Sequence, residues 1–201
     1  MTLQVATAKS AMVVFIAIVL SALSACGSGS SAGPLSNVTT GGQPNFSIAS
    51  IYTAPGQSAD MSAYLVNSAH DPVTLLSANL ILIAGHSSGH LVLVGVQAGL
   101  GGIAAAAGWP VKGVSIRSLP IRLRYGRSSI IFGFRGSDTG RNYMTAGLKI
   151  TYRYRGQIYT VEAWSAAVDC VVANPNRAAG SATCEKAYRI AKQATEHLAG
   201  A

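Results

Sequence analysis

The chain has 201 residues and a formal net charge of +8, with 15 Lys and Arg residues against 7 Asp and Glu. Hydrophobic residues make up 49% of the chain and charged residues only 11%, well below the usual quarter. This composition excludes an intrinsically disordered chain, and the length is sufficient for one domain with a substantial hydrophobic core.

The first patterned segment is an uncharged apolar run that follows Lys9, begins at Ala11 and closes on Cys26. It is too short for a comfortable membrane span, and the small residues at its end suit a signal peptidase. Leu23-Ser24-Ala25-Cys26 resembles the lipobox of bacterial lipoproteins. The resemblance implies that residues 1–25 are a lipoprotein signal peptide and that Cys26 becomes the lipidated first residue. It also implies attachment to the cell membrane, on the extracytoplasmic face.

The segment after Cys26 is rich in Gly, Ser, Thr, Pro and Asn as far as Asn45. This composition is typical of flexible linkers, so we expect a tether over residues 26–45 and a folded domain over 46–201. With Cys26 assigned to lipid, Cys170 and Cys184 remain. In an oxidising compartment we expect these two to form a disulfide, with two buried free thiols as the alternative.

From Phe46 onward, short segments rich in β-branched residues alternate with clusters of Gly, Pro, Asn and Asp, a pattern that predicts strands. The predicted strands are Phe46–Tyr52, Ser62–Asn67, Val73–Ala84, Leu91–Val96, Val114–Arg117, Ser128–Phe134, Ala146–Tyr154 and Gln157–Ala166. Their number and spacing favour an antiparallel sandwich or barrel. The stretch from Asn67 to Leu75 also resembles a strand–turn–strand passage of Ig-like and fibronectin-like modules. We therefore predict a mainly β, Ig-like or fibronectin-like sandwich with a C-terminal helix.

The last two predicted strands form a hairpin whose register can be worked out from the sequence. A turn at Arg155-Gly156 uses the freedom of Gly to adopt a positive φ. On the core side, the expected pairs are then Tyr154 with Gln157, Tyr152 with Tyr159, Ile150 with Val161 and Leu148 with Ala163. On the opposite side, they are Lys149 with Glu162, Thr151 with Thr160 and Arg153 with Ile158. A slip by one residue would turn the aromatic and aliphatic set outward.

After Cys184 the apolar residues recur at helical spacing, which predicts a helix over about 184–198, capped by Thr183 and packed on the sheet. The long uncharged run from Leu91 to Trp109 contains many glycines. We expect it to be a buried strand followed by a Gly/Ala-rich segment rather than a membrane span.

The segment Gly85-His86-Ser87-Ser88-Gly89 resembles the nucleophile elbow of α/β-hydrolases. That resemblance implies Ser87 as nucleophile, His197 as base and Asp138 or Asp169 as the residue that orients it. However, the chain before the elbow is too short for the βα units of that family, and a strand-like run follows the serine. We therefore expect a protein that is not an enzyme, and we keep a serine hydrolase as the alternative.

Three histidines, His70, His86 and His90, lie in two neighbouring turns of the predicted sandwich and provide a second alternative, a metal site. No Asp, Glu or Cys nearby in the sequence completes a cluster around His86 and His90, and the local Gly and Ser residues oppose a helix. We therefore expect exposed loop histidines, no metal and no cofactor.

Between Lys112 and Arg155 the chain carries ten basic residues and a single acid, Asp138, for a segment charge of +9. Arg122 and Arg124 alternate with apolar residues, which places both on one face of a strand. The candidates for anion binding are Arg117, Arg122, Arg124 and Arg127. Such a patch attracts anionic partners; the alternative is a solvated sheet face.

For an exported protein the anionic partners would be lipids or envelope polymers, and we expect no nucleic acid. We therefore predict a membrane-anchored lipoprotein with a non-enzymatic binding, scaffolding or accessory role in the envelope. Its protein partner is not identified by the sequence.

Overall fold

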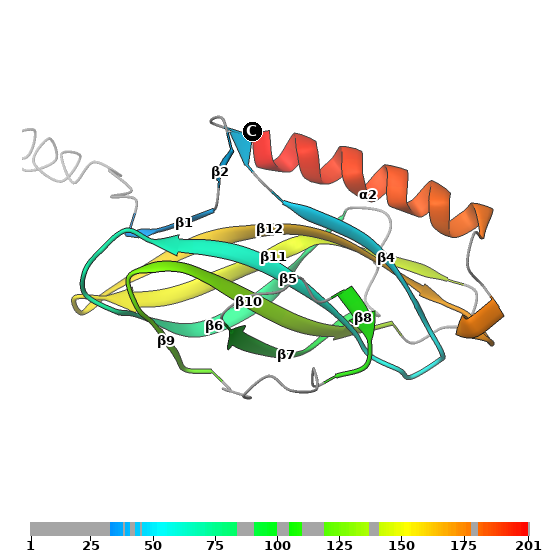
Figure 1. Cartoon of the computed structure of the whole chain (residues 1–201), viewed down its shortest axis with the longest axis horizontal. Coiled ribbons are helices and arrows are strands. Elements are labelled where there is room, and N and C mark those ends of the chain that lie inside the picture. The colour runs from blue at the N-terminus through cyan, green and yellow to red at the C-terminus, as the bar shows by residue number, and fades with distance from the viewer. Residues whose placement is uncertain are drawn as a thin grey trace, which may run out of the picture. The chain divides into compact units, whose positions relative to one another are not determined.

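The computed structural model describes residues 33–37, 39–40, 43–44, 46–83, 91–99, 105–109, 119–136, 141–177 and 181–200. These residues form two five-stranded sheets, a two-stranded ribbon and a C-terminal helix that lies along one of the sheets (Figure 1). The predicted signal peptide and Cys26 fall outside this part of the chain. Residues Gly33–Ala201 make up one compact unit.

The two sheets are built from strands that are distant in sequence. The first sheet has the order β1 (Leu35–Asn37), β5 (Ala59–Asn67), β10 (Gly126–Arg135) and β7 (Val92–Gly99), with β8 (Ala105–Ala107) paired to β5. The second has the order β4 (Ser47–Thr53), β12 (Gln157–Val171), β11 (Asn142–Tyr154), β6 (Val73–Leu82) and β9 (Ile121–Leu123). The ribbon pairs β2 (Thr39–Thr40) with β3 (Gln43–Pro44).

All neighbouring strands are antiparallel except β4 and β12, which run parallel. The order β1-β5-β10-β7 corresponds to the A-B-E-D sheet of the immunoglobulin fold, and β6-β11-β12 corresponds to its C-F-G sheet. The predicted Ig-like sandwich with a C-terminal helix is therefore confirmed.

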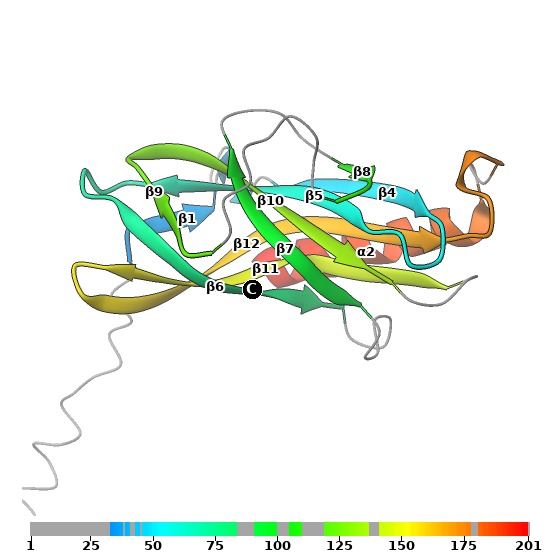
Figure 2. The same cartoon turned by 90° about the horizontal axis from the view of Figure 1, so that it is seen from below.

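The described residues form three layers, which Figures 1 and 2 show from two directions, and two hydrophobic cores lie between these layers. Between the sheets lie fully buried side chains such as Met61, Phe132 and Ile150. The second core lies between β4, β12 and β11 on one side and α2 (Ala182–Gly200) on the other. It includes Trp164 and Ala191. The helix thus covers part of the outer face of the second sheet.

The β11–β12 hairpin confirms the predicted register in all seven pairs, from Tyr154 with Gln157 to Leu148 with Ala163. Both turn residues have positive φ, 48° at Arg155 and 80° at Gly156, as a two-residue turn of type I′ requires. Tyr152 is fully buried and Lys149 is exposed, so the two faces are also as predicted.

The N-terminal boundary of the domain corrects the prediction. β1 lies inside the predicted tether of residues 26–45, yet Leu35 is buried in the first core and pairs with Asn67 of β5. A single apolar residue in a polar segment gives no periodic pattern, so the sequence did not reveal the strand. The predicted strand Val114–Arg117 lies outside the described residues. β9 is not among the predicted strands, although the alternation of Arg122 and Arg124 with apolar residues indicated a strand face there.

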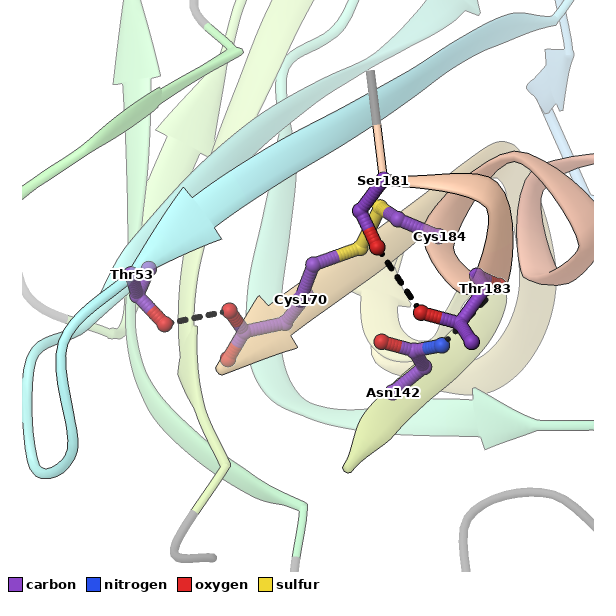
Figure 3. The surroundings of a disulfide bond; sticks show 7 residues. Thr53, Asn142, Cys170, Ser181, Thr183 and Cys184 are labelled. Atoms are coloured by element: carbon purple, nitrogen blue, oxygen red, sulfur yellow. Dashed lines mark hydrogen bonds between the residues drawn. A yellow bond between two sulfur atoms is a disulfide. The ribbon is translucent and has the colours of Figure 1, made fainter. Parts of the chain in front are cut away.

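The last strand runs farther than predicted, to Val171, so Cys170 lies on β12 instead of after it. Cys170 and Cys184 form the predicted disulfide, with their Cα atoms 6.0 Å apart, and it joins β12 to the first turn of α2 (Figure 3). The helix begins at Ala182, and Glu185 N donates to Ser181 O at 3.0 Å. Ser181 is therefore the residue that precedes the helix, and the predicted cap at Thr183 is wrong.

Among the described residues, none of the helices is both long and apolar enough to cross a membrane.

Candidate anion-binding site

The loop that joins β5 to β6 carries His70 and is held from two sides. From the end of β5, the buried Asn67 accepts a hydrogen bond from Ala69 N at 3.0 Å and donates to Asp71 O at 3.2 Å. From outside, Pro34 O accepts hydrogen bonds from the backbone N and the hydroxyl of Ser68, at 3.0 and 3.1 Å. These bonds fix the course of the loop and leave His70 exposed.

The edge strand β9 brings two arginines next to this loop. β9 pairs antiparallel with β6, and the register places Arg122 opposite Thr74. Ile121 and Leu123 point into the core, where both are buried, so Arg122 and Arg124 are exposed on the other face. This arrangement agrees with the predicted alternation.

An open pocket of about 590 Å³ lies between the loop and the edge strand, lined by His70, Pro72, Arg122, Arg124 and Tyr125. Two of these residues, His70 and Tyr125, stack their rings against each other, with centroids 5.1 Å apart and an interplanar angle of 16°. Two guanidinium groups and an aromatic pair thus converge on one space. We call these five residues the basic pocket.

The carboxylate in the loop, Asp71, has a cation of its own. Arg155, in the turn of the β11–β12 hairpin, donates from Nε and Nη2 to the same Asp71 oxygen at 2.9 and 2.8 Å. Hydrogen bonding to Asp71, together with the negative charge of that carboxylate, raises the pKa of Arg155. Neither Arg122 nor Arg124 forms an ion pair with a carboxylate in the described part of the chain. Among the described residues, no carboxylate therefore neutralises these two arginines.

The three predicted anion-binding arginines that the structure describes do not lie at one place. Arg122 and Arg124 line the basic pocket, whereas Arg127 is the second residue of β10, in the other sheet, and lies over the Tyr64 ring, 4.4 Å from its centroid. Arg117 falls outside the described residues. Arg153 is exposed on β11 and shares a row with Arg122, because both pair with Thr74 of β6.

The proposed hydrolase residues are dispersed where they are described. Asp169 is buried on the face of β12 that points between the sheets, where it accepts hydrogen bonds from Thr53 Oγ1 at 2.5 Å and Gly136 N at 3.1 Å. Burial raises its pKa, and these two hydrogen bonds oppose the rise. His197 is exposed on α2, which packs on the opposite face of β12. Ser87 and Asp138 lie outside the described residues.

The segment that contains Ser87 joins β6 to β7, which belong to different sheets. A nucleophile elbow instead joins a strand to a helix. For the metal alternative, the described residues contain no group of three or more His, Cys, Asp or Glu side chains placed to hold an ion. His70 belongs to the basic pocket, and His86 and His90 lie outside the described residues.

No protein-family model matches the chain, and no curated protein matches it. Among solved structures, it is similar to an ASH/PapD-like domain of human CEP192, with a TM-score of 0.32, 13% identity and coverage of 64% of this chain and 84% of that one. It is also similar to the CooA pilin subunit of enterotoxigenic Escherichia coli, with a TM-score of 0.32, 12% identity and coverage of 69% and 98%. The assignment of the sandwich rests on the strand pairing described above.

Proposed function

We propose that this protein is a lipid-anchored, extracytoplasmic binding or scaffolding protein without catalytic activity, and that its basic pocket binds an oxyanion of an envelope component. The observation that carries the proposal is the convergence of Arg122, Arg124 and His70 on one pocket whose neighbouring carboxylate, Asp71, is paired with Arg155. Planar guanidinium groups match the geometry of phosphate and carboxylate oxygens and stay charged at any physiological pH.

The anchor is supported by the order of features in the leader: Lys9, an uncharged apolar run, and Leu-Ser-Ala before Cys26. Mass spectrometry of the mature protein tests it directly. We expect an N-terminal Cys26 that carries lipid, and a Cys26→Ser variant that carries none. A mature N-terminus elsewhere would contradict the anchor and leave the pocket unaffected.

The pocket is tested with a soluble anion, short-chain polyphosphate, by calorimetric titration at several salt concentrations. We expect binding that weakens with salt and is lost in Arg122→Gln/Arg124→Gln. The matched control is Lys186→Gln/Arg189→Gln, which removes the same charge from exposed positions on α2. Equal binding by both variants would contradict an anion-binding role for the pocket.

The hydrolase alternative has its own test, because a fluorophosphonate probe labels activated serines. We expect no labelling of the purified protein. Labelling that disappears in Ser87→Ala would contradict a purely non-enzymatic role.

A further inference from the structure

The chain enters the domain at the end that carries the basic pocket. Leu35 begins β1 opposite Asn67, and Pro34 O is bonded to Ser68, two residues before His70. Both views place β1, the β5–β6 turn, β9 and the tip of the β11–β12 hairpin at one end of the sandwich, with the 3₁₀ turn η1 (Pro175–Arg177) at the other (Figures 1 and 2). We call these the pocket end and the disulfide end.

The connection between the predicted lipid and the domain is short. Because β1 belongs to the first sheet, only the residues from Cys26 to Gly33 separate the anchor from the folded unit. The seven residues after Cys26, 27–33, reach at most about 25 Å when fully extended. By contrast, the 15 residues of β12 extend roughly 50 Å from the pocket end toward the disulfide end. A lipid on Cys26 therefore keeps the pocket end close to the bilayer surface.

The pocket end also carries the side chains that suit a membrane surface. Arg122, Arg124 and Arg153 are exposed there, and Tyr125 is 62% exposed beside them. Each basic residue near an anionic lipid surface is attracted to it. Tyrosine is favoured at the level of the head groups because its ring is apolar and its hydroxyl group is polar.

We propose that the basic pocket binds the phosphate groups of anionic phospholipids in the same membrane that holds the Cys26 lipid. Resting on the function proposed above, this inference names the ligand of the pocket and fixes the orientation of the domain. The lipid and the pocket then act at the same end, and the disulfide end points away from the bilayer. Two such signals together hold a protein on a membrane more firmly than either alone.

Cosedimentation with vesicles tests the ligand. The mature chain with Cys26→Ser is mixed with vesicles of phosphatidylglycerol and phosphatidylcholine, or of phosphatidylcholine alone. We expect binding only to the anionic vesicles, weakened about 30-fold in Arg122→Gln/Arg124→Gln, since each basic residue near such a surface changes affinity about fivefold. Lys186→Gln/Arg189→Gln should bind as the unmodified chain does.

The same proteins, titrated with polyphosphate, separate this inference from the function on which it rests. If the pocket variant loses polyphosphate binding but keeps vesicle binding, the pocket binds soluble oxyanions and the membrane inference is wrong. If neither binding changes, both proposals are wrong. Loss of both in the pocket variant alone supports both.

The orientation is tested with lipidated protein in anionic vesicles, carrying a fluorophore at Gln157→Cys in the pocket end or at Ala173→Cys in the disulfide end. Both positions are exposed. We expect head-group quenchers to act strongly at position 157 and weakly at position 173, with the contrast reduced by Arg122→Gln/Arg124→Gln. Equal quenching at the two positions would overturn the proposed orientation.

Discussion

The two ends of the sandwich differ in whether their carboxyl groups are buried or exposed. At the disulfide end two carboxyl groups are buried, Asp60 at 2% exposure and Asp169 at 0%. At the pocket end the charged side chains of Arg122, Arg124 and Asp71 are exposed. The two ends also differ in the side-chain link that joins neighbouring elements. A disulfide joins β12 to α2 at the disulfide end, whereas an exposed ion pair joins Arg155 to Asp71 at the pocket end.

From this contrast we expect the disulfide end to determine stability and the pocket end to determine binding. A buried carboxyl group is costly unless it is hydrogen-bonded or protonated, so the disulfide end is where changes should alter stability. Exposed arginines add little to stability because solvent screens their pairs, but they remain free to attract a ligand. Changes at the pocket end should therefore alter binding and leave the fold intact.

The largest effect on stability should come from removing the disulfide. In Cys170→Ser/Cys184→Ser the unfolded chain regains the freedom of a loop of about 15 residues, worth about 3 kcal/mol in the chain-entropy model. Urea unfolding measures the loss, and reduction of the unmodified protein should produce a similar one. Polyphosphate affinity should not change, and a change there would contradict the independence of the two ends.

The second effect is a dependence of stability on pH. Burial raises the pKa of Asp60 from 3.8 to about 6, although a hydrogen bond from the backbone of Ala106 lowers it. Between about pH 4 and pH 6 the folded state then holds a proton that the unfolded state releases, so stability falls as the pH rises through this window. The loss is up to about 3 kcal/mol for a shift of this size. The raised pKa of Asp169 acts in the same direction.

Asp60→Asn checks this prediction by urea unfolding at pH 4.5 and 7.5. The variant should lose less stability than the unmodified protein when the pH is raised, with a residual slope from Asp169. Glu162→Gln, at an exposed position on β12, is the control and should leave the slope unchanged. A slope that is the same in Asp60→Asn and the unmodified protein would show that Asp60 is already ionised at low pH.

A third, smaller effect concerns the hydrogen bond from Thr53 to Asp169. Thr53→Val keeps the shape of the side chain but removes the donor to Asp169 Oδ1. An unsatisfied buried acceptor costs about 1–3 kcal/mol, measured by urea unfolding at neutral pH. The control is Thr160→Val, an exposed position on the outward face of β12. Equal stability of the two variants would indicate that the bond is not formed in solution.

The sequence predicted what depends on neighbours along the chain. The β11–β12 register follows from one turn, Arg155-Gly156, and the alternation on either side of it, and every predicted pair is present. The helix and the sandwich class were predicted from local periodicity and from the spacing of the strands. The disulfide was predicted from the two cysteines that remain once Cys26 is assigned to lipid. Strand β1, with a single buried leucine, leaves no periodic signal and was missed, whereas the alternation around Arg122 indicated a strand face at β9 but not its partner strand.

The candidate site was only partly predictable because it depends on long-range pairing. The sequence placed Arg122 and Arg124 on one face, but not next to His70, since that contact arises from the pairing of β9 with β6. Tyr125 stacks on His70 for the same reason. Arg127 is close to Arg124 in the sequence, yet it belongs to the other sheet, so charge density along the chain overestimated the size of the patch.

The smallest effect, and the sharpest test of the pocket end, concerns the pair of Arg155 and Asp71. Both side chains are largely exposed, at 72% and 54%, so neither Arg155→Gln nor Asp71→Asn should shift the unfolding midpoint measurably. Their effects on polyphosphate affinity should have opposite signs. Arg155→Gln leaves the Asp71 charge unbalanced beside His70 and should weaken binding, whereas Asp71→Asn removes that charge and should strengthen it, each by roughly two- to fivefold. Calorimetric titration of both variants and of the double variant measures the coupling. Effects of the same sign would mean that the pair shapes the loop and does not set the charge of the pocket.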